Sequence, residues 1–171
     1  MSLVKFREVQ KFRQPWVWAL LLGSIGLLFF IFGSGLIRQL GTGQPWGNQP
    51  MSDTGLIVTS LITFGVSAAL IWLFLIMALI VEVRDDALYI HFKPLKRRQV
   101  AYSDIVKVEA VRYRPIMHYG GWGIRRGRNG WAYNVSGDQG VRLDLQDGTD
   151  LMIGSQRFVE LAAAIDKERG R

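Results

Sequence analysis

The sequence predicts a membrane α-helical hairpin of two transmembrane helices, followed by a mainly-β barrel or sandwich of about seven antiparallel strands capped by a C-terminal α-helix. Two uncharged stretches, residues 16–37 and 55–81, each exceed the about 20 residues that a helix needs to cross a hydrocarbon core. From residue 81 onward apolar and polar residues alternate, which is the period of a strand. Residues 158–165 then carry apolar side chains at helical spacing, so one helix closes the chain.

The chain therefore divides into five parts. They are a basic juxtamembrane segment (1–15), a first transmembrane helix (16–37), an extracytoplasmic loop (38–54), a second transmembrane helix (55–80) and a cytoplasmic β domain (81–171). Of the 171 residues 49% are hydrophobic, concentrated in the first half as in a membrane protein. The chain has no cysteine, which excludes disulfides, thiolate metal ligands and a cysteine nucleophile.

The first 15 residues place basic side chains among apolar ones at a spacing that fits neither helix nor strand. We expect a short amphipathic segment beside the membrane, and a frayed basic flank that only sets topology is the equal alternative. A cleaved secretory signal is disfavoured, because the apolar stretch is too long and no small-x-small site precedes Arg38.

The first span opens with two amphipathic rings, Trp16 and Trp18, which suit a membrane interface. Small residues recur on one face of each span and let helix backbones approach closely in lipid. They are Ala19, Gly23, Gly26 and Gly33 in the first span and Gly65, Ala68 and Ala69 in the second. We expect the two spans to pack on each other there, and a homodimer through the same faces is the alternative.

The loop between the spans carries one cation, Arg38, whereas lysine and arginine are frequent before the first span and after the second. This asymmetry predicts that both termini are cytoplasmic. Trp46 in the loop is interpreted as a ring at the membrane interface, with an outward recognition point as the alternative.

Alternation and turn residues predict the strands of the β domain. The expected strands are residues 81–84, 88–93, 96–102, 106–110, 119–126, 130–135, 141–146 and 151–153, with turns at Asp85-Asp86, Asn129-Gly130 and Asp147-Gly148. In the closing helix, Ser155 is the expected N-cap, and the apolar stripe is Phe158, Leu161, Ala162 and Ile165.

Strand order and several runs resemble uncharacterised bacterial two-helix membrane proteins with a C-terminal pleckstrin-homology-like (PH-like) domain. The runs that carry this resemblance are FREVQKFRQPWVWAL, AYSDIVKVEAVR, YGGWGIRRG and DLQDGTDLMIGSQRFVELAAAI. The resemblance covers essentially the whole chain. It implies the fold and a multi-pass location in the bacterial plasma (inner) membrane, but no activity, because one fold hosts many functions.

We find no constellation of catalytic groups. His91 and His118 are interpreted as solvated or hydrogen-bonded side chains, and Asp85-Asp86 as a turn. The sequence contains no phosphate-binding glycine motif, zinc-protease motif or nucleophile elbow. We therefore expect a non-enzymatic protein with no cofactor and no metal site.

Two basic clusters and one tryptophan are the candidate contacts with a partner or with lipid. They are Lys96, Arg97 and Arg98, and Trp122, Arg125, Arg126 and Arg128. Near an anionic leaflet each cation can add about 1 kcal/mol of attraction, and a solvated face is the equal alternative. The glycines around Trp122 predict a bend in the strand, with a partner surface as the alternative.

We expect the β domain to mediate protein contacts beside the bilayer, in a scaffold, assembly or regulatory role, with a membrane or cytoplasmic protein as partner. Recognition of anionic membrane lipid by the basic surface is the alternative. In lipid-binding PH relatives the basic residues gather on the first hairpin loop, where this chain has Asp85 and Asp86, so specific headgroup recognition there is disfavoured. A net charge of +4 on residues 82–171 is also small for a nucleic-acid binder.

Overall fold

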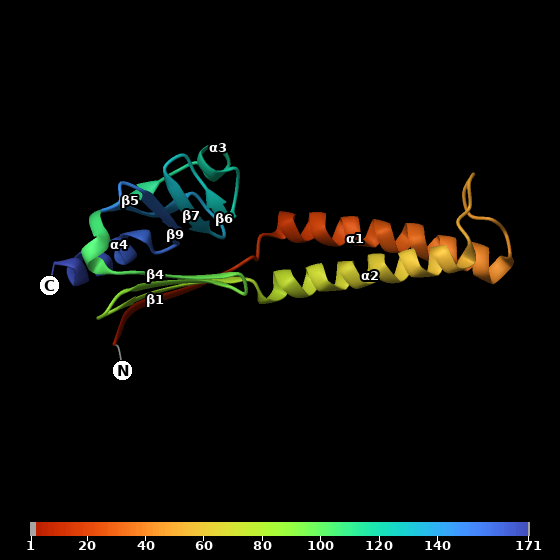
Figure 1. Cartoon of the computed structure of the whole chain (residues 1–171), viewed down its shortest axis with the longest axis horizontal. Coiled ribbons are helices and arrows are strands. Elements are labelled where there is room, and N and C mark those ends of the chain that lie inside the picture. The colour runs from red at the N-terminus through yellow and green to blue at the C-terminus, as the bar shows by residue number, and fades with distance from the viewer. Residues whose placement is uncertain (1–2, 171) are drawn as a thin grey trace. The chain divides into compact units, whose positions relative to one another are not determined.

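The computed structural model describes residues 3–170 and consists of two compact units. The helical unit is Arg13–Leu75, and the β unit combines the chain up to Phe12 with the chain from Ile76 onward. Two long apolar helices, nine strands in two sheets and a C-terminal helix make up the described chain, together with three shorter helical segments (Figure 1). The β unit therefore includes the segment that precedes the first long helix.

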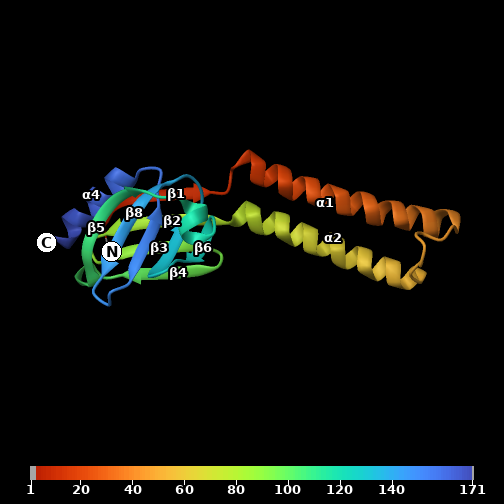
Figure 2. The same ribbon diagram turned by 90° about the horizontal axis from the view of Figure 1, so that it is seen from above.

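The helical unit consists of α1 (Pro15–Leu36), the π-helical turn η1 (Ile37–Gly41) and α2 (Asp53–Ile76). By length and composition both long helices can cross a membrane. They run side by side (Figure 2), and the rings of Phe29 and Phe64 stack with centroids 4.2 Å apart. α1 begins at Pro15, one residue before the predicted start, and α2 stops at Ile76 and not at residue 80.

The small-residue faces lie outside the contact between the two helices. A Cβ added to Gly23, Gly26, Gly33 or Gly65 would meet no atom within 4 Å. The prediction that the spans pack through these faces is therefore wrong, because the bulky rings of Phe29 and Phe64 occupy the contact instead. A homodimer through the same faces stays a prediction.

Trp46 folds back on the end of α1. A Cβ on Gly35 would come within 2.7 Å of the indole ring, so only glycine allows this approach. Gln39 supports the same loop by donating from its amide to the Met51 carbonyl (2.8 Å) and the Asp53 carboxylate (2.7 Å). The loop between the helices is thus ordered by polar and ring contacts with α1 and α2.

The first sheet has the order β1-β2-β3-β4 and is antiparallel throughout. Its strands are β1 (Val4–Lys11), β2 (Ala78–Arg84), β3 (Leu88–Lys93) and β4 (Lys96–Val100). The sequence correctly predicted β3, the turn at Asp85-Asp86 and β4 at a sheet edge, but β2 starts three residues earlier than expected. Alternation in β2 and β3 buries Val81, Val83 and Ile90 on the inner face.

β1 corrects the expected juxtamembrane segment. It pairs with β2 from Val4 opposite Arg84 to Lys11 opposite Ala78. Its buried residues alternate, but two of them, Glu8 and Gln10, are polar, while Val9 on the other face is exposed. A strand with polar residues inward lacks the apolar alternation by which strands are predicted.

The second sheet has the order β5-β8-β9-β7-β6. Its strands are β5 (Ile105–Arg112), β6 (Gly123–Arg126), β7 (Gly130–Asn134), β8 (Gln139–Leu145) and β9 (Asp150–Gly154), and η2 (Tyr102–Asp104) leads into it. β7 and β9 are parallel, which corrects the expectation of antiparallel strands only. β8 runs antiparallel to β9 on its other side, so the chain reverses direction before and after β8, and β7 and β9 can pair in parallel.

Of the expected strand over residues 119–126, only residues 123–126 form a strand, because Tyr119 ends a short helix and residues 120–122 form a bend. Pro115 opens a short helix, α3 (Pro115–Tyr119), at the position where proline is tolerated. Gly120, Gly121 and Gly123 all have positive φ, which keeps the chain from being extended until Gly123. α3 brings Tyr119 against Tyr113, with ring centroids 5.9 Å apart, beside the buried Met152 of β9.

Helix α4 (Phe158–Arg169) closes the core and packs against strands of both sheets. Leu161 and Ile165 of its predicted stripe are fully buried. Ser155 is not its N-cap, because the helix begins three residues later. The Ser155 hydroxyl instead donates to the buried carboxylate of Glu8 (2.5 Å) and accepts from the Arg157 backbone N–H (3.0 Å).

Candidate binding surfaces of the β unit

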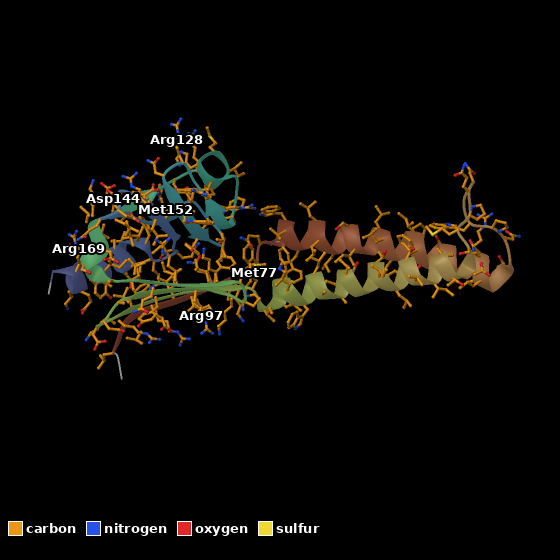
Figure 3. All side chains as sticks on the ribbon, viewed as in Figure 1. Met77, Arg97, Arg128, Asp144, Met152 and Arg169 are labelled. Atoms are coloured by element: carbon orange, nitrogen blue, oxygen red, sulfur yellow. The ribbon has the colours of Figure 1, made fainter. Side chains whose placement is uncertain are left out.

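The first basic cluster surrounds the tight turn between β3 and β4. The turn is closed by the Leu95 backbone N–H, which donates to the Phe92 carbonyl (2.8 Å). Strand register places Lys96 opposite Phe92 and Arg97 opposite His91, so these two cations point to opposite faces of the sheet. Arg97 projects from the face away from the second sheet (Figure 3), whereas Arg98 is half-buried. The three predicted residues thus serve two different surfaces.

Lys96 joins the first basic cluster to the second. Its ammonium lies 4.4 Å from the ring centroid of Trp131 on β7, a cation–π contact between the two sheets. Trp131 is the register partner of Arg126 on β6. Residues of the two clusters, 30 positions apart in the sequence, therefore meet around one tryptophan. Sequence reasoning missed Trp131 as a site residue, since only the tertiary contact distinguishes it from any other strand aromatic.

Arg125, Arg126 and Arg128 are exposed. The Arg125 guanidinium donates to the Trp122 carbonyl (3.0 Å), which holds it along the bend before β6. Arg128 lies in the turn between β6 and β7, and Figure 3 shows it projecting outward from the second sheet. This turn is the predicted hairpin at Asn129-Gly130.

Trp122 is half-buried and bonded at its polar end. Its indole N–H donates to the Gly137 carbonyl (3.0 Å), in the turn between β7 and β8. The next residue, Gly123, donates its backbone N–H to the side chain of Asn134 (2.9 Å), whose amide in turn donates to the Tyr113 hydroxyl (2.8 Å). Through these contacts Trp122 stabilises the bend before β6. Its role in partner binding stays a prediction.

The outer face of the first sheet carries a shallow hollow of about 650 Å³. We call this surface the outer-face hollow. Its lining comes from all four strands and includes Arg7, Ile80, Glu82, Arg84, Tyr89, His91, Lys93, Arg97 and Gln99. Glu82 supplies the only carboxylate of this lining and pairs with Arg7 (3.1 Å) and Arg84 (2.5 Å). Lys93 and Arg97 leave the hollow with an excess of positive charge.

The acidic turn beside this hollow is engaged in local contacts. The Arg84 guanidinium lies over the Tyr89 ring, 4.5 Å from its centroid, and the Tyr89 hydroxyl donates to Asp86 (2.6 Å). This hydrogen bond lowers the pKa of Asp86 and raises the pKa of Tyr89. Asp85 accepts from the backbone N–H of Leu3 (3.1 Å), so the turn also fixes the start of β1.

His91 is the side chain of the hollow whose ordinary pKa lies closest to neutral pH. Its Nε2 accepts a hydrogen bond from the Arg97 guanidinium (3.0 Å), which requires a neutral imidazole. Partial burial lowers the pKa of His91, and the charges of Arg97 and Lys93 lower it further, while Glu82 opposes them. His118, the other histidine, is exposed on α3. Within residues 3–170 no group of three or more metal-ligating side chains comes together.

Comparison of the chain with models of known families, with curated proteins and with solved structures gave no match. The functional conclusion therefore rests on the geometry of the described residues.

Proposed function

We propose that the chain is an integral membrane protein with two spans, whose β unit is a PH-like module that binds a protein partner beside the bilayer and does no catalysis. The partner surface is the outer-face hollow, and the partner is the acidic segment of a membrane or cytoplasmic protein. A scaffold, assembly or regulatory role follows from this arrangement.

The architecture of the β unit supports a PH-like module. A four-stranded and a five-stranded sheet enclose one apolar core, and a C-terminal helix packs on both sheets. Three polar side chains in or beside the outer-face hollow are engaged with neighbours: Glu82 with two arginines, Asp86 with Tyr89, and His91 with Arg97. These contacts hold the charged groups of the surface in place, which suits a binding role.

The observation that carries the proposal is the composition of the outer-face hollow. Arginine and tyrosine are the residues most often found at binding hot spots, and here Arg84 is stacked on Tyr89 in a fixed geometry. The surplus cations Lys93 and Arg97 favour an acidic partner, because complementary charge steers association and rejects basic surfaces.

Photo-crosslinking tests the proposed partner surface. A benzophenone amino acid at Gln99, in the hollow, should give one discrete protein adduct in the native membrane. The same probe at the exposed Val106 of β5 should not. Arg97→Glu should remove the adduct at Gln99, while Arg112→Glu, at an exposed position of β5, should leave it. An adduct that survives Arg97→Glu, or equal adducts at both probe sites, would contradict the proposal.

The proposed location is the bacterial plasma membrane with both termini in the cytoplasm. The excess of lysine and arginine outside the loop supports this orientation. The pairing of β1 with β2 supports a common side for both ends of the helical unit. Reporter fusions at the C-terminus and near Asn48 test it, and activity of an external reporter at the C-terminus would refute the orientation.

A further inference from the structure

We infer that the turn between β3 and β4 binds the anionic headgroups of the membrane leaflet, with Leu95 entering the interface and Lys93 and Lys96 contacting phosphate. The inference rests on the proposed membrane location and not on a protein partner, although Lys93 and Arg97 also line the outer-face hollow. It assigns a lipid-contacting site to residues 93–97.

The turn lies next to the end of α2. Only Met77 separates Ile76, the last residue of α2, from Ala78, the first residue of β2. Strand register sets Ala78 opposite Lys93, where the turn begins. Ile76 also lines a small hollow of about 320 Å³ together with residues 91 and 93–97. The residue at which the span ends and the basic turn are therefore neighbours.

The length of α2 puts its end at the headgroups. Twenty-four helical residues extend about 36 Å at about 1.5 Å per residue, against about 30 Å of hydrocarbon. If α2 crosses the bilayer, Ile76 lies just outside the hydrocarbon core, and the turn beside it lies at the depth of the lipid phosphates.

The side chains of the turn suit that depth. Leu95 is a large apolar side chain that is 61% exposed, and it is flanked by Lys93, Lys96 and Arg97. The sequence has no acidic residue from position 87 to position 103. An apolar residue between cations is the pattern by which segments enter the interface and attract anionic lipid.

The third observation is that Lys96 is already held in place. Its ammonium sits on the Trp131 ring, and Trp131 is the register partner of Arg126, so one cation from each sheet adjoins this tryptophan. The opposite end of β3 carries Asp85 and Asp86. β3 thus runs from an acidic end to a basic end, and the basic end is the one beside α2, as attraction to an anionic leaflet requires.

The absence of cysteine permits a clean test. Leu95→Cys and Val159→Cys each introduce a single thiol for a fluorescent label, and Val159 on α4 is matched at 61% exposure. The full chain is reconstituted in phosphatidylcholine vesicles with or without phosphatidylglycerol, and quenching by nitroxide-bearing lipid is recorded. We expect strong quenching at position 95 only with phosphatidylglycerol, and none at position 159.

Charge variants separate recognition from mere closeness to the span. Replacing Lys93 or Lys96 with Gln in the Leu95→Cys chain should lower the ratio of bound to free turn about fivefold for each lysine. Raising NaCl from about 0.1 to about 1 M should do the same, because the Debye length falls from about 10 Å to about 3 Å. Lys107→Gln, an exposed lysine on β5, is the matched control and should have no effect.

Equal quenching at positions 95 and 159 would overturn the inference, as would quenching at 95 that is the same without phosphatidylglycerol. Absence of a protein crosslink at Gln99, together with quenching at position 95 as expected, would refute the protein-partner proposal alone. Intact crosslinking with no quenching would refute the lipid contact alone. Circular dichroism spectra of the labelled variants that match the parent chain would show that the variants are folded.

Discussion

His91 makes the outer-face hollow sensitive to pH. Its neutral Nε2 accepts from Arg97, and its lowered pKa means that protonation costs more in the folded than in the unfolded chain. The folded state is therefore favoured above the unfolded pKa of about 6.5 and loses that advantage as pH falls through the lowered folded value. Arg97 and Lys93 face the protonated ring with like charge, and Glu82 alone opposes them.

We predict that the stability of the β unit falls as the pH drops below about 6.5 in the parent chain and falls much less in His91→Gln. Glutamine keeps an acceptor for Arg97 but does not titrate. Urea midpoints of both full-length chains in mild detergent, measured across this range, check the prediction. Parallel curves for the two chains would mean that other groups cause the pH dependence.

At the scale of the element, β1 is held by polar groups and not by apolar burial alone. The Glu8 carboxylate accepts from the Ser155 hydroxyl (2.5 Å) and the Gln156 backbone N–H (2.9 Å), and the Gln10 amide donates to the Gly154 carbonyl (2.8 Å). These contacts join the first strand of the chain to the junction between β9 and α4, near the other end of the sequence.

We predict that Glu8→Ala lowers the free energy of unfolding by about 1–3 kcal/mol, because it leaves a buried hydroxyl and a backbone N–H unpaired. Val9→Ala is the control on the same strand, since Val9 is 47% exposed, and it should cost under about 0.5 kcal/mol. Chemical unfolding of the full chain, followed by near-ultraviolet circular dichroism, measures both. Similar losses in the two variants would show that the Glu8 contacts contribute little.

The elements predictable from sequence were those whose signals are local. The two long apolar helices follow from uncharged length, β3 from strict alternation, and the hairpin of β8 and β9 from Asp147-Gly148 between apolar strands. β1 was missed because Glu8 and Gln10 point inward. α3 was missed because Tyr119 was assigned to a strand bent by the glycines, while the helix starts four residues earlier at Pro115. The parallel pairing of β7 with β9 joins distant segments and has no local signal.

The candidate sites follow the same division. The sequence indicated both basic clusters, because their cations are adjacent in the chain. It could not show that Lys96 and Arg126 converge on Trp131, or that Arg7 joins strands 75 residues away in one hollow, because these are contacts between strands. The glycines around Trp122 drew attention to it in the sequence, but its hydrogen bond to Gly137 depends on where the next turn lies.

At the scale of the whole molecule, the helical unit is inserted into a β-hairpin. Lys11 pairs with Ala78, so the strands before and after the two long helices are neighbours. We predict that residues 3–12 joined by Asn-Gly to residues 77–170 fold without the helices, because this dipeptide forms tight turns between adjacent antiparallel strands.

The matched comparison is residues 77–170 without β1. It should be less stable by about 3 kcal/mol or more, since it lacks the burial of Phe6 and the hydrogen bonds of Glu8 and Gln10. Urea unfolding of the two soluble chains tests this difference. Equal midpoints would show that β1 is dispensable to the β unit.

The split hairpin has a consequence for biosynthesis. β1 leaves the ribosome before its partner β2, which follows only after residues 12–77, roughly 3–13 s later at about 5–20 residues per second. During that interval β1 has an unpaired edge and two inward polar side chains with no partner. On the proposed topology, in which both long helices cross the membrane, β1 pairs with β2 only if both ends of the helical unit lie on the same side. Assembly of this sheet would then require correct insertion of both helices.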